Sequence, residues 1–158
     1  MPITPLHFGA LAPVNHWFPG KVSLVSFTLA NLAMDWNAIQ YYLFGLEPPL
    51  ELHSPFTHSL LAAVIFATIL SVLPLKWIGK WVCGAFLGTV SHVVLDALVH
   101  SEMQPFYPIH WNPLYAGLME PLTWILLPLM IWFIVQTVSS CSDWVRKRQE
   151  ARQAPLES

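Results

Sequence analysis

The sequence predicts an all-α integral membrane protein, a bundle of about four transmembrane helices. Of the 158 residues, 55% are hydrophobic and only 10% are charged, whereas soluble domains carry about 25% charged residues. So few charges cannot cover a globule with a solvated surface. Backbone groups in lipid have to be satisfied internally, and the alternating segments of about ten residues that a barrel needs are missing, so helices are expected.

Four apolar segments are expected to cross the membrane, and these are residues 22–44, 57–75, 78–99 and 118–138. About 20 helical residues, each rising ~1.5 Å, cross a hydrocarbon core of roughly 30 Å. The first segment is the least regular, because Asn31, Asp35 and Asn37 interrupt it. Residues 4–20 permit an N-terminal re-entrant segment, since proline and glycine punctuate them.

The basic residues predict the orientation. With four crossings, all seven lie on one side, and they are Lys21, Lys76, Lys80, Arg146, Lys147, Arg148 and Arg152. By the positive-inside rule that side is cytoplasmic, so the loops 45–56 and 100–117 face outward. The expected organisation is a membrane domain over residues 1–142, followed by a basic, polar, cytoplasmic tail over residues 143–158.

Charge and composition also limit which binding partners are expected. The net charge is −2 and no basic stripe lies outside the tail, so a nucleic-acid partner is not expected and the lipid bilayer is. Gly84 and Gly88 form a small-xxx-small spacing that permits a homo-oligomer. The two cysteines, Cys83 and Cys141, do not indicate a disulfide framework.

Ionisable residues inside the apolar segments point to a metal site. His92, Asp96 and His100 are spaced at i, i+4 and i+8, which places them on one helix face. An alternative is a buried histidine that only hydrogen-bonds to its aspartate neighbour. Asp35 and His58 are expected at a similar depth on two other helices, which favours a shared site. An Asp inside a membrane costs about 2.5–3.5 kcal/mol and is a functional hypothesis by default.

The ligand types narrow the choice of metal. Oxygen and nitrogen ligands without thiolate suit a divalent ion, with zinc the leading candidate and manganese or iron as alternatives. One or two ions fit, because Asp96 can bridge. Five side chains are expected to orient the metal ligands by hydrogen bonds to their remote atoms, and they are Asn37, Thr57, Ser59, Ser91 and Glu102.

At these positions the sequence resembles the bacterial family of predicted membrane-bound, metal-dependent hydrolases. The stretches that carry the resemblance are Thr4-Pro5-Leu6-His7-Phe8-Gly9, Asp35-Trp36-Asn37, His53-Ser54-Pro55-Phe56-Thr57-His58-Ser59 and Ser91-His92-Val93-Val94-Leu95-Asp96. Ser54 and Pro55 replace the Arg-Gly usual in that family, and Asn37 replaces its second Asp. The resemblance implies a bacterial inner-membrane location.

The order of ligands is also similar to that of zinc-dependent phospholipase C and the S1/P1-type nucleases. That similarity implies that one metal is held by Asp35, His58, His92 and Asp96, and a second by His7 with Asp96. His100 is a further candidate ligand on the same helix face. The HxxxE element that completes the third zinc site of the phospholipases is absent here.

These resemblances imply a metal-dependent hydrolase acting on a phosphate or carboxylic ester, such as a phospholipid or another lipid-linked substrate near the outer face. Glu102, or the metal-bound hydroxide, would act as the catalytic base. One alternative is a non-catalytic membrane protein that binds a metal or haem. Another is an assembly or transport partner in which these side chains only join the helices.

Overall fold

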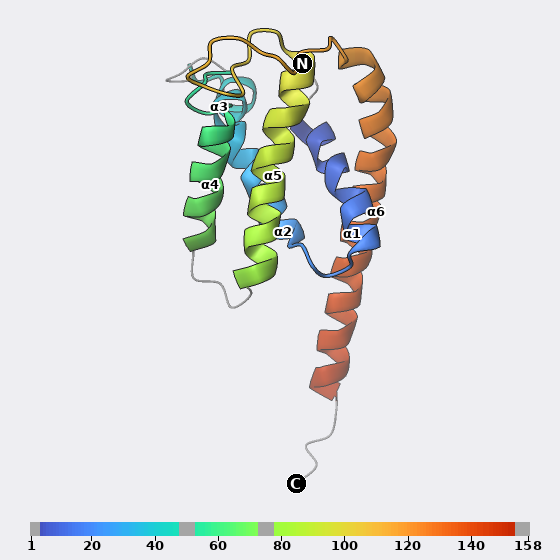
Figure 1. Ribbon diagram of the computed structural model, residues 1–158. Helices are drawn as coiled ribbons and strands as arrows, with labels where there is room; N and C mark the ends of the chain where they lie inside the picture. Colours follow the sequence, from blue (N-terminus) through green and yellow to red (C-terminus); the bar gives the residue numbers. More distant parts are fainter. Residues whose placement is uncertain (1–3, 48–52, 73–77, 154–158) are drawn as a thin grey trace.

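The computed structural model describes residues 4–47, 53–72 and 78–153, and in these residues all regular structure is helical. The all-α class is therefore confirmed. The elements are η1 (Thr4–Ala10, a 3-10 helix), α1 (Leu11–Trp17), α2 (Leu24–Met34), α3 (Trp36–Phe44), α4 (Leu60–Val72), α5 (Ile78–Val99) and α6 (Met119–Gln153). Figure 1 shows α2, α4 and α5 side by side, with α1 beside α6.

Among the described residues, two helices are long and apolar enough to cross a membrane, over residues 79–99 and 119–152. They coincide, to within one residue at the start, with the third predicted crossing, 78–99, and cover nearly all of the fourth, 118–138. The helices α2 and α4 have only 11 and 13 residues, which at ~1.5 Å per residue is short of a roughly 30 Å hydrocarbon core. The predicted second crossing, 57–75, includes residues 73–75, which lie outside the described residues. The number of crossings stays a prediction.

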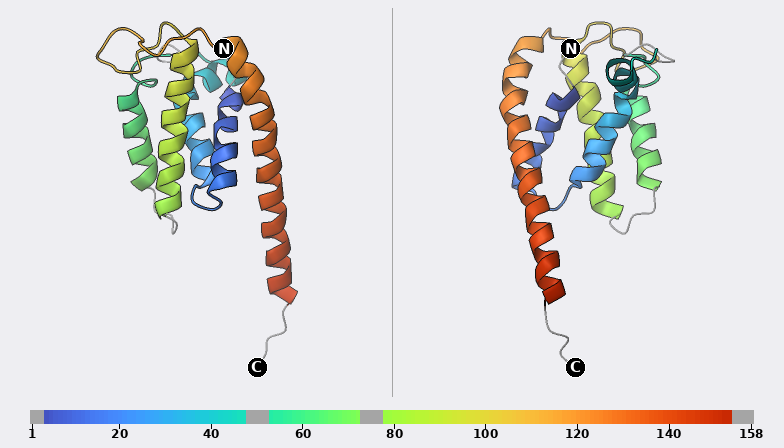
Figure 2. Two further views of the ribbon diagram at one scale, coloured as in Figure 1. Left: turned by 45° about the vertical axis from the view of Figure 1, so that its right-hand side comes forward. Right: turned by 180° about the vertical axis from the view of Figure 1, so that it is seen from behind.

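The first predicted crossing, 22–44, is divided into two helices at Asp35. This residue ends α2 and precedes α3, with φ −89° and ψ 17°. In the right-hand view of Figure 2, α3 points toward the viewer at one end of the bundle, roughly perpendicular to the other helices, which stand upright. Asn31, Asp35 and Asn37 are all buried. The polar residues that made this segment irregular therefore face the interior, and the break places Asp35 among the helices.

Close packing of α5 against α2 depends on two glycines. A Cβ on Gly88 would lie 2.7 Å from both the Ala30 Cβ and the Phe27 carbonyl oxygen, and one on Gly84 would overlap Ser26. Small residues let membrane helices approach closely in this way. The helix face that carries Gly84 and Gly88, which the sequence offered for a homo-oligomer, thus packs against α2 of the same chain.

The N-terminal segment runs alongside α6. A Cβ on Gly9 would lie 2.8 Å from the Leu126 carbonyl oxygen, and Asn15 donates a 3.0 Å hydrogen bond to Gln136. The segment begins near the C-terminal end of α5 and ends near Lys80, whose carbonyl accepts a 2.9 Å hydrogen bond from the Ser23 amide. It runs from one end of the bundle to the other, and its re-entrant character stays a prediction.

The loop after α5 holds two helix ends together. The Pro105 carbonyl accepts a 2.8 Å hydrogen bond from the Leu60 amide at the start of α4. The Asn112 side chain donates to the carbonyls of Ala97 and His100, at 2.7 and 2.8 Å. These bonds satisfy groups that a helix end leaves unpaired. The loop therefore joins the start of α4 to the end of α5.

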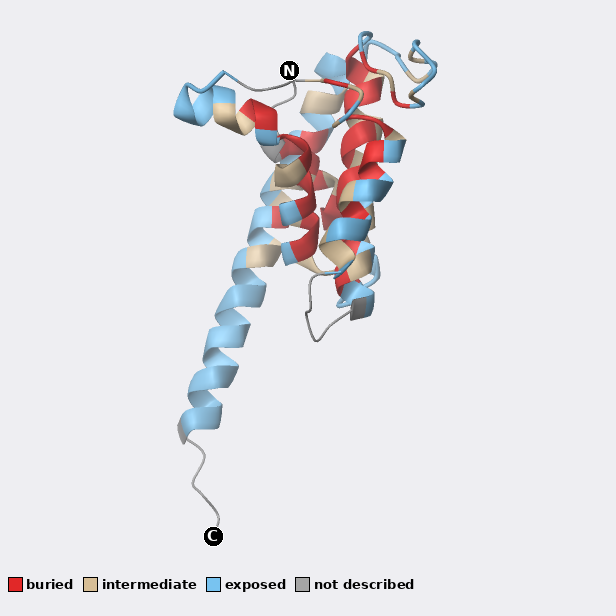
Figure 3. Cartoon of the chain, turned by 90° about the vertical axis from the view of Figure 1, so that its left-hand side faces the viewer, coloured by how far each residue is buried: buried red, intermediate tan, exposed pale blue. Residues whose placement is uncertain are grey.

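Burial is concentrated in the half of the bundle near this loop, and the C-terminal half of α6 is exposed (Figure 3). The predicted tail, 143–158, begins inside α6, which continues without a break to Gln153. Within residues 143–153 the chain is an exposed helix, in which Arg146 pairs with Asp143 at 3.0 Å. The proposed division at residue 142 is therefore a change in composition within one helix.

Candidate metal centre

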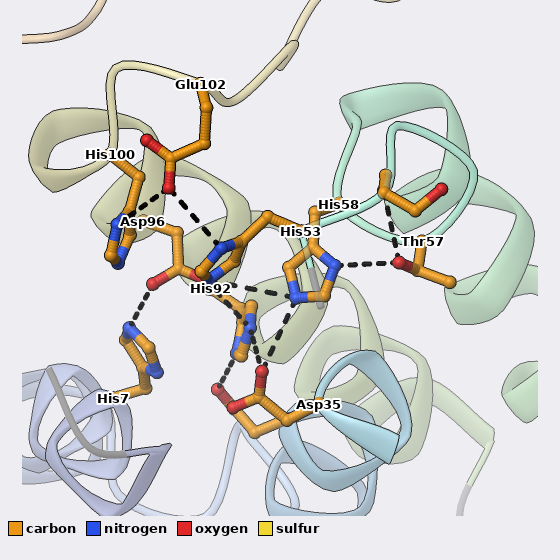
Figure 4. Close-up of polar contacts among 11 residues, drawn as sticks. His7, Asp35, His53, Thr57, His58, His92, Asp96, His100 and Glu102 are labelled. Atoms are coloured by element: carbon orange, nitrogen blue, oxygen red, sulfur yellow. Dashed lines mark hydrogen bonds and ion pairs between the residues drawn. The ribbon is translucent and has the colours of Figure 1, made fainter. Parts of the chain in front are cut away.

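Four metal-ligand side chains from three parts of the chain meet where the helices are most deeply packed. They are Asp35 between α2 and α3, His58 just before α4, and His92 and Asp96 on α5. All four are buried, and each offers a ligand atom within 4.8 Å of the others. We call these residues the inner group (Figure 4).

The contacts within the inner group run between imidazole nitrogens and carboxylate oxygens. His92 Nε2 lies 3.2 Å from Asp96 Oδ2 and 3.3 Å from Asp35 Oδ1. His58 Nε2 lies 3.4 Å from the same Asp35 oxygen and 4.0 Å from Asp96 Oδ2. Both histidines therefore direct Nε2 toward the two carboxylates.

An acceptor on the far side of each ring can hold the imidazole proton on Nδ1, the tautomer that a metal at Nε2 requires. The amide nitrogen of Asn31 donates to the Phe27 carbonyl at 3.0 Å, so its Oδ1 faces His92. That oxygen can only accept, so His92 Nδ1–H donates to it across 3.2 Å. Neutral His92 therefore presents an Nε2 lone pair to the carboxylates.

The same reasoning applies to His58. The Thr57 hydroxyl donates its one proton to the Ser54 carbonyl at 3.1 Å. With its proton directed there, the hydroxyl oxygen can accept from His58 Nδ1–H, which lies 2.8 Å away. In this tautomer His58 presents a lone pair at Nε2, whereas in the other tautomer Nε2–H donates to Asp35 Oδ1 at 3.4 Å. An acceptor at the remote ring nitrogen is usual for histidines that bind metals.

This arrangement fits a divalent cation. Two lone pairs and two carboxylates converge in a buried space, and His92 Nε2 makes no hydrogen bond there. Two buried carboxylates carry a charge that costs several kcal/mol per ion unless it is compensated. Lys80 lies at the opposite end of α5, sixteen residues or ~24 Å from Asp96. A divalent ion held by one atom from each of the four residues would compensate this charge.

His7 lies beside the inner group but is not one of its members. Its Nε2 is 3.2 Å from Asp96 Oδ1, the oxygen that faces away from the other histidines, and its ring centroid is 4.4 Å from that of His92. His7 is 1% exposed, and neither ring nitrogen makes a hydrogen bond. Asp96 thus has one oxygen for the inner group and one for His7, which is consistent with the predicted bridging role.

His100 and Glu102 belong to a second group. His100 Nδ1 lies 3.4 Å from Glu102 Oε1, and His53 Nδ1 lies 3.7 Å from the same oxygen. We call these three residues the outer group, because the Glu102 side chain is 60% exposed. Burial lowers the pKa of His53 below its ordinary value, a shift that Asp96 opposes in part. His53 therefore stays neutral near pH 7, with a lone pair to offer.

The sequence reasoning left out two residues of this region. Asn31 orients His92, and it precedes Asp35 by one helical turn, a spacing that places both on the same face of α2. His53 was not assigned to the site, although it opens the stretch that ends in His58. Of the predicted supporting residues, Thr57 contacts a ligand of the inner group, and Glu102 contacts His100.

The fold and the site define a class: a helical membrane protein whose helices enclose a buried, anionic group of side chains able to bind a metal. The chain belongs to the YdjM inner membrane protein family, whose family model matches residues 6–154. This agrees with the predicted inner-membrane location. Neither a curated protein nor a solved structure matches the chain, so the likeness to phospholipase C and the nucleases stays a prediction from motif order.

Proposed function

We propose that this protein is a membrane-embedded, metal-dependent hydrolase of a phosphate or carboxylic ester. The observation that carries the proposal is the inner group, in which two histidines with occupied Nδ1 atoms turn their lone pairs toward two buried carboxylates. Zinc suits this set of nitrogen and oxygen ligands, and manganese and iron are the alternatives. A bound ion of this kind supplies Lewis-acid activation of water at neutral pH.

The protein's own residues hold and orient the ion. Asn31 and Thr57 fix the rings of His92 and His58, and Asp96 ties the inner group to His7. These contacts keep the ligand atoms in place before an ion binds, which reduces the reorganisation that binding and catalysis require. The motif order shared with the membrane-bound hydrolases supports the same function.

The distribution of charge supports an outward-facing site on a multi-pass protein. Lys21 and Lys80 lie at the end of the bundle away from the inner group, and the four basic residues of α6 follow its apolar part. The positive-inside rule would place these ends and the C-terminus in the cytoplasm. Phe56 and Trp111, both exposed near the site, suit the headgroup level of the membrane. A phospholipid or another lipid-linked ester is therefore the favoured substrate class.

The competing function is metal binding without catalysis. Haem binding is less well supported, because a haem protein places axial ligands on opposite faces of a macrocycle. Here four ligand atoms, two of them carboxylate oxygens, lie within 4.8 Å of one another. That geometry suits a single ion better than a porphyrin.

The test combines metal analysis with ester hydrolysis on the full chain purified in detergent. We expect bound zinc, and hydrolysis of nitrophenyl phosphate, bis-nitrophenyl phosphate or nitrophenyl butyrate that a chelator abolishes and added zinc restores. His92→Ala should lose both, whereas His16→Ala, at an exposed position distant from the inner group, should keep both. Bound metal with no hydrolysis of a synthetic ester or of phospholipid vesicles would identify a metal-binding protein instead.

A further inference from the structure

The outer group, His53, His100 and Glu102, has the composition of a metal site in its own right. Each residue offers one ligand atom, and these atoms lie within 4.8 Å of one another. The three residues come from the loop before α4, from the position after α5 and from the following turn. They approach each other because the Leu60–Pro105 hydrogen bond joins these two regions.

Both imidazoles turn the same atom toward the carboxylate. The ring centroids of His53 and His100 lie 4.3 Å apart with 30° between the ring planes, and the Nδ1 atoms lie 3.7 and 3.4 Å from Glu102 Oε1. The His100 side chain is only 9% exposed, and its Nε2 makes no hydrogen bond.

The outer group continues the inner one toward the surface. The His53 ring centroid lies 5.4 Å from that of His58, and the His100 amide donates a 2.8 Å hydrogen bond to the Asp96 carbonyl. Exposure rises along this line, from His58, which is fully buried, to Glu102, which is 60% exposed. Figure 4 shows the two groups next to each other, with Glu102 on the far side of His53 and His100 from Asp35.

We propose that His53, His100 and Glu102 form a second divalent-metal site, so that the protein has a two-ion centre with a buried and an accessible ion. Two nitrogen ligands and one oxygen ligand suit zinc and leave a position open for substrate, as catalytic zinc sites do. Glu102 is then a metal ligand rather than the catalytic base that the sequence predicted. The catalytic meaning rests on the proposed function, and there a two-ion centre favours phosphate esters, whose oxygens such centres clamp.

The test is the number of zinc ions that the full chain binds. The protein is stripped with a chelator in detergent, dialysed against increasing zinc chloride, and analysed for zinc per chain. We expect about two ions for the wild type and about one for Glu102→Gln and for His53→Gln, since each removes a ligand of the outer group. His110→Ala is the control, because this exposed histidine contacts Gln104 instead, and it should keep both ions.

Glu102→Gln is the decisive variant, because its exposed side chain can change without disturbing the packing. Circular dichroism checks that this variant keeps the helical content of the wild type. One zinc ion per wild-type chain would overturn the second site. Two ions in Glu102→Gln together with lost hydrolysis would also overturn it and identify Glu102 as the base. Two ions in the wild type without ester hydrolysis would support this site and contradict the hydrolase function.

Discussion

His92 Nδ1 lies 3.2 Å from Oδ1 of Asn31, an oxygen that can only accept a hydrogen bond. This contact connects α5 to α2 and fixes which nitrogen of His92 faces the carboxylates. Asn31 is fully buried on an apolar helix, and this contact gives its side-chain oxygen a hydrogen-bond partner.

Removing a ligand of the inner group should remove its ion. Asp96→Ala deletes the oxygen next to His92 and the oxygen next to His7 in a single change. We expect metal content in the purified protein to fall at least to the level of His92→Ala, as measured by elemental analysis. Metal content equal to the wild type in both variants would contradict the inner group as a binding site.

Removing a supporting acceptor should weaken binding without abolishing it. Thr57→Val takes away the oxygen that accepts from His58 Nδ1–H. Loss of such contacts weakens metal binding about 10–100-fold, which zinc titration against a competing chelator measures. Thr57→Ser keeps a hydroxyl and should bind nearly as the wild type does. Equal weakening in both variants would show that the threonine methyl group, not the hydroxyl, is what matters.

Enlarging Gly88 should separate α2 from α5. A Cβ there would lie 2.7 Å from backbone and side-chain atoms of α2, and overpacking of this kind costs about 1–3 kcal/mol. We expect Gly88→Ala to lower the thermal unfolding temperature and reduce bound metal, because Asn31 and His92 move apart. Gly79→Ala is the matched control, since its Cβ would meet nothing within 4 Å. Similar unfolding temperatures for the two variants would refute the close packing.

The apoprotein should lose stability on mild acidification, in part through His53. Burial lowers the pKa of His53 in the folded protein, so below its ordinary value of about 6.5 the unfolded chain binds more protons than the folded one. Stability from this residue is present above pH ~6.5 and decreases as the pH falls through the folded pKa. Thermal unfolding in chelator should therefore depend less on pH in His53→Gln. An unchanged pH dependence would exclude His53 from this effect.

Much of the architecture follows from patterns that lipid imposes. Long apolar runs predict the two helices that are able to cross a membrane, and the i, i+4 spacing of His92 and Asp96 predicts that they share a face. The break at Asp35 was not predicted, because composition alone does not show whether a polar residue interrupts a helix or faces its interior. The packing of residues 4–17 along α6 was not specified by the sequence. Their close approach to α6 depends on Gly9 meeting the backbone at Leu126, a contact between distant parts of the chain.

The roles of individual histidines were harder to predict than their location. His58 and His92 stand in motifs, and the structure places them together. The separation of His100 from the inner group depends on where α5 ends and on the turn that brings Glu102 back toward His53. Such turns are governed by bonds like those of Asn112 to the α5 carbonyls, which no periodic pattern reveals.

The residues of the inner group are far apart in the sequence, at positions 35, 58, 92 and 96. This separation affects the order of events during biogenesis. Segments inserted into lipid gain little from hydrophobic attraction to each other, so helices can enter the bilayer before they associate. A chain still being synthesised has an incomplete ligand set until the last turns of α5 have emerged. If the inner group binds an ion and the helices insert one by one, as proposed, ion capture comes late in assembly and joins the helices after insertion.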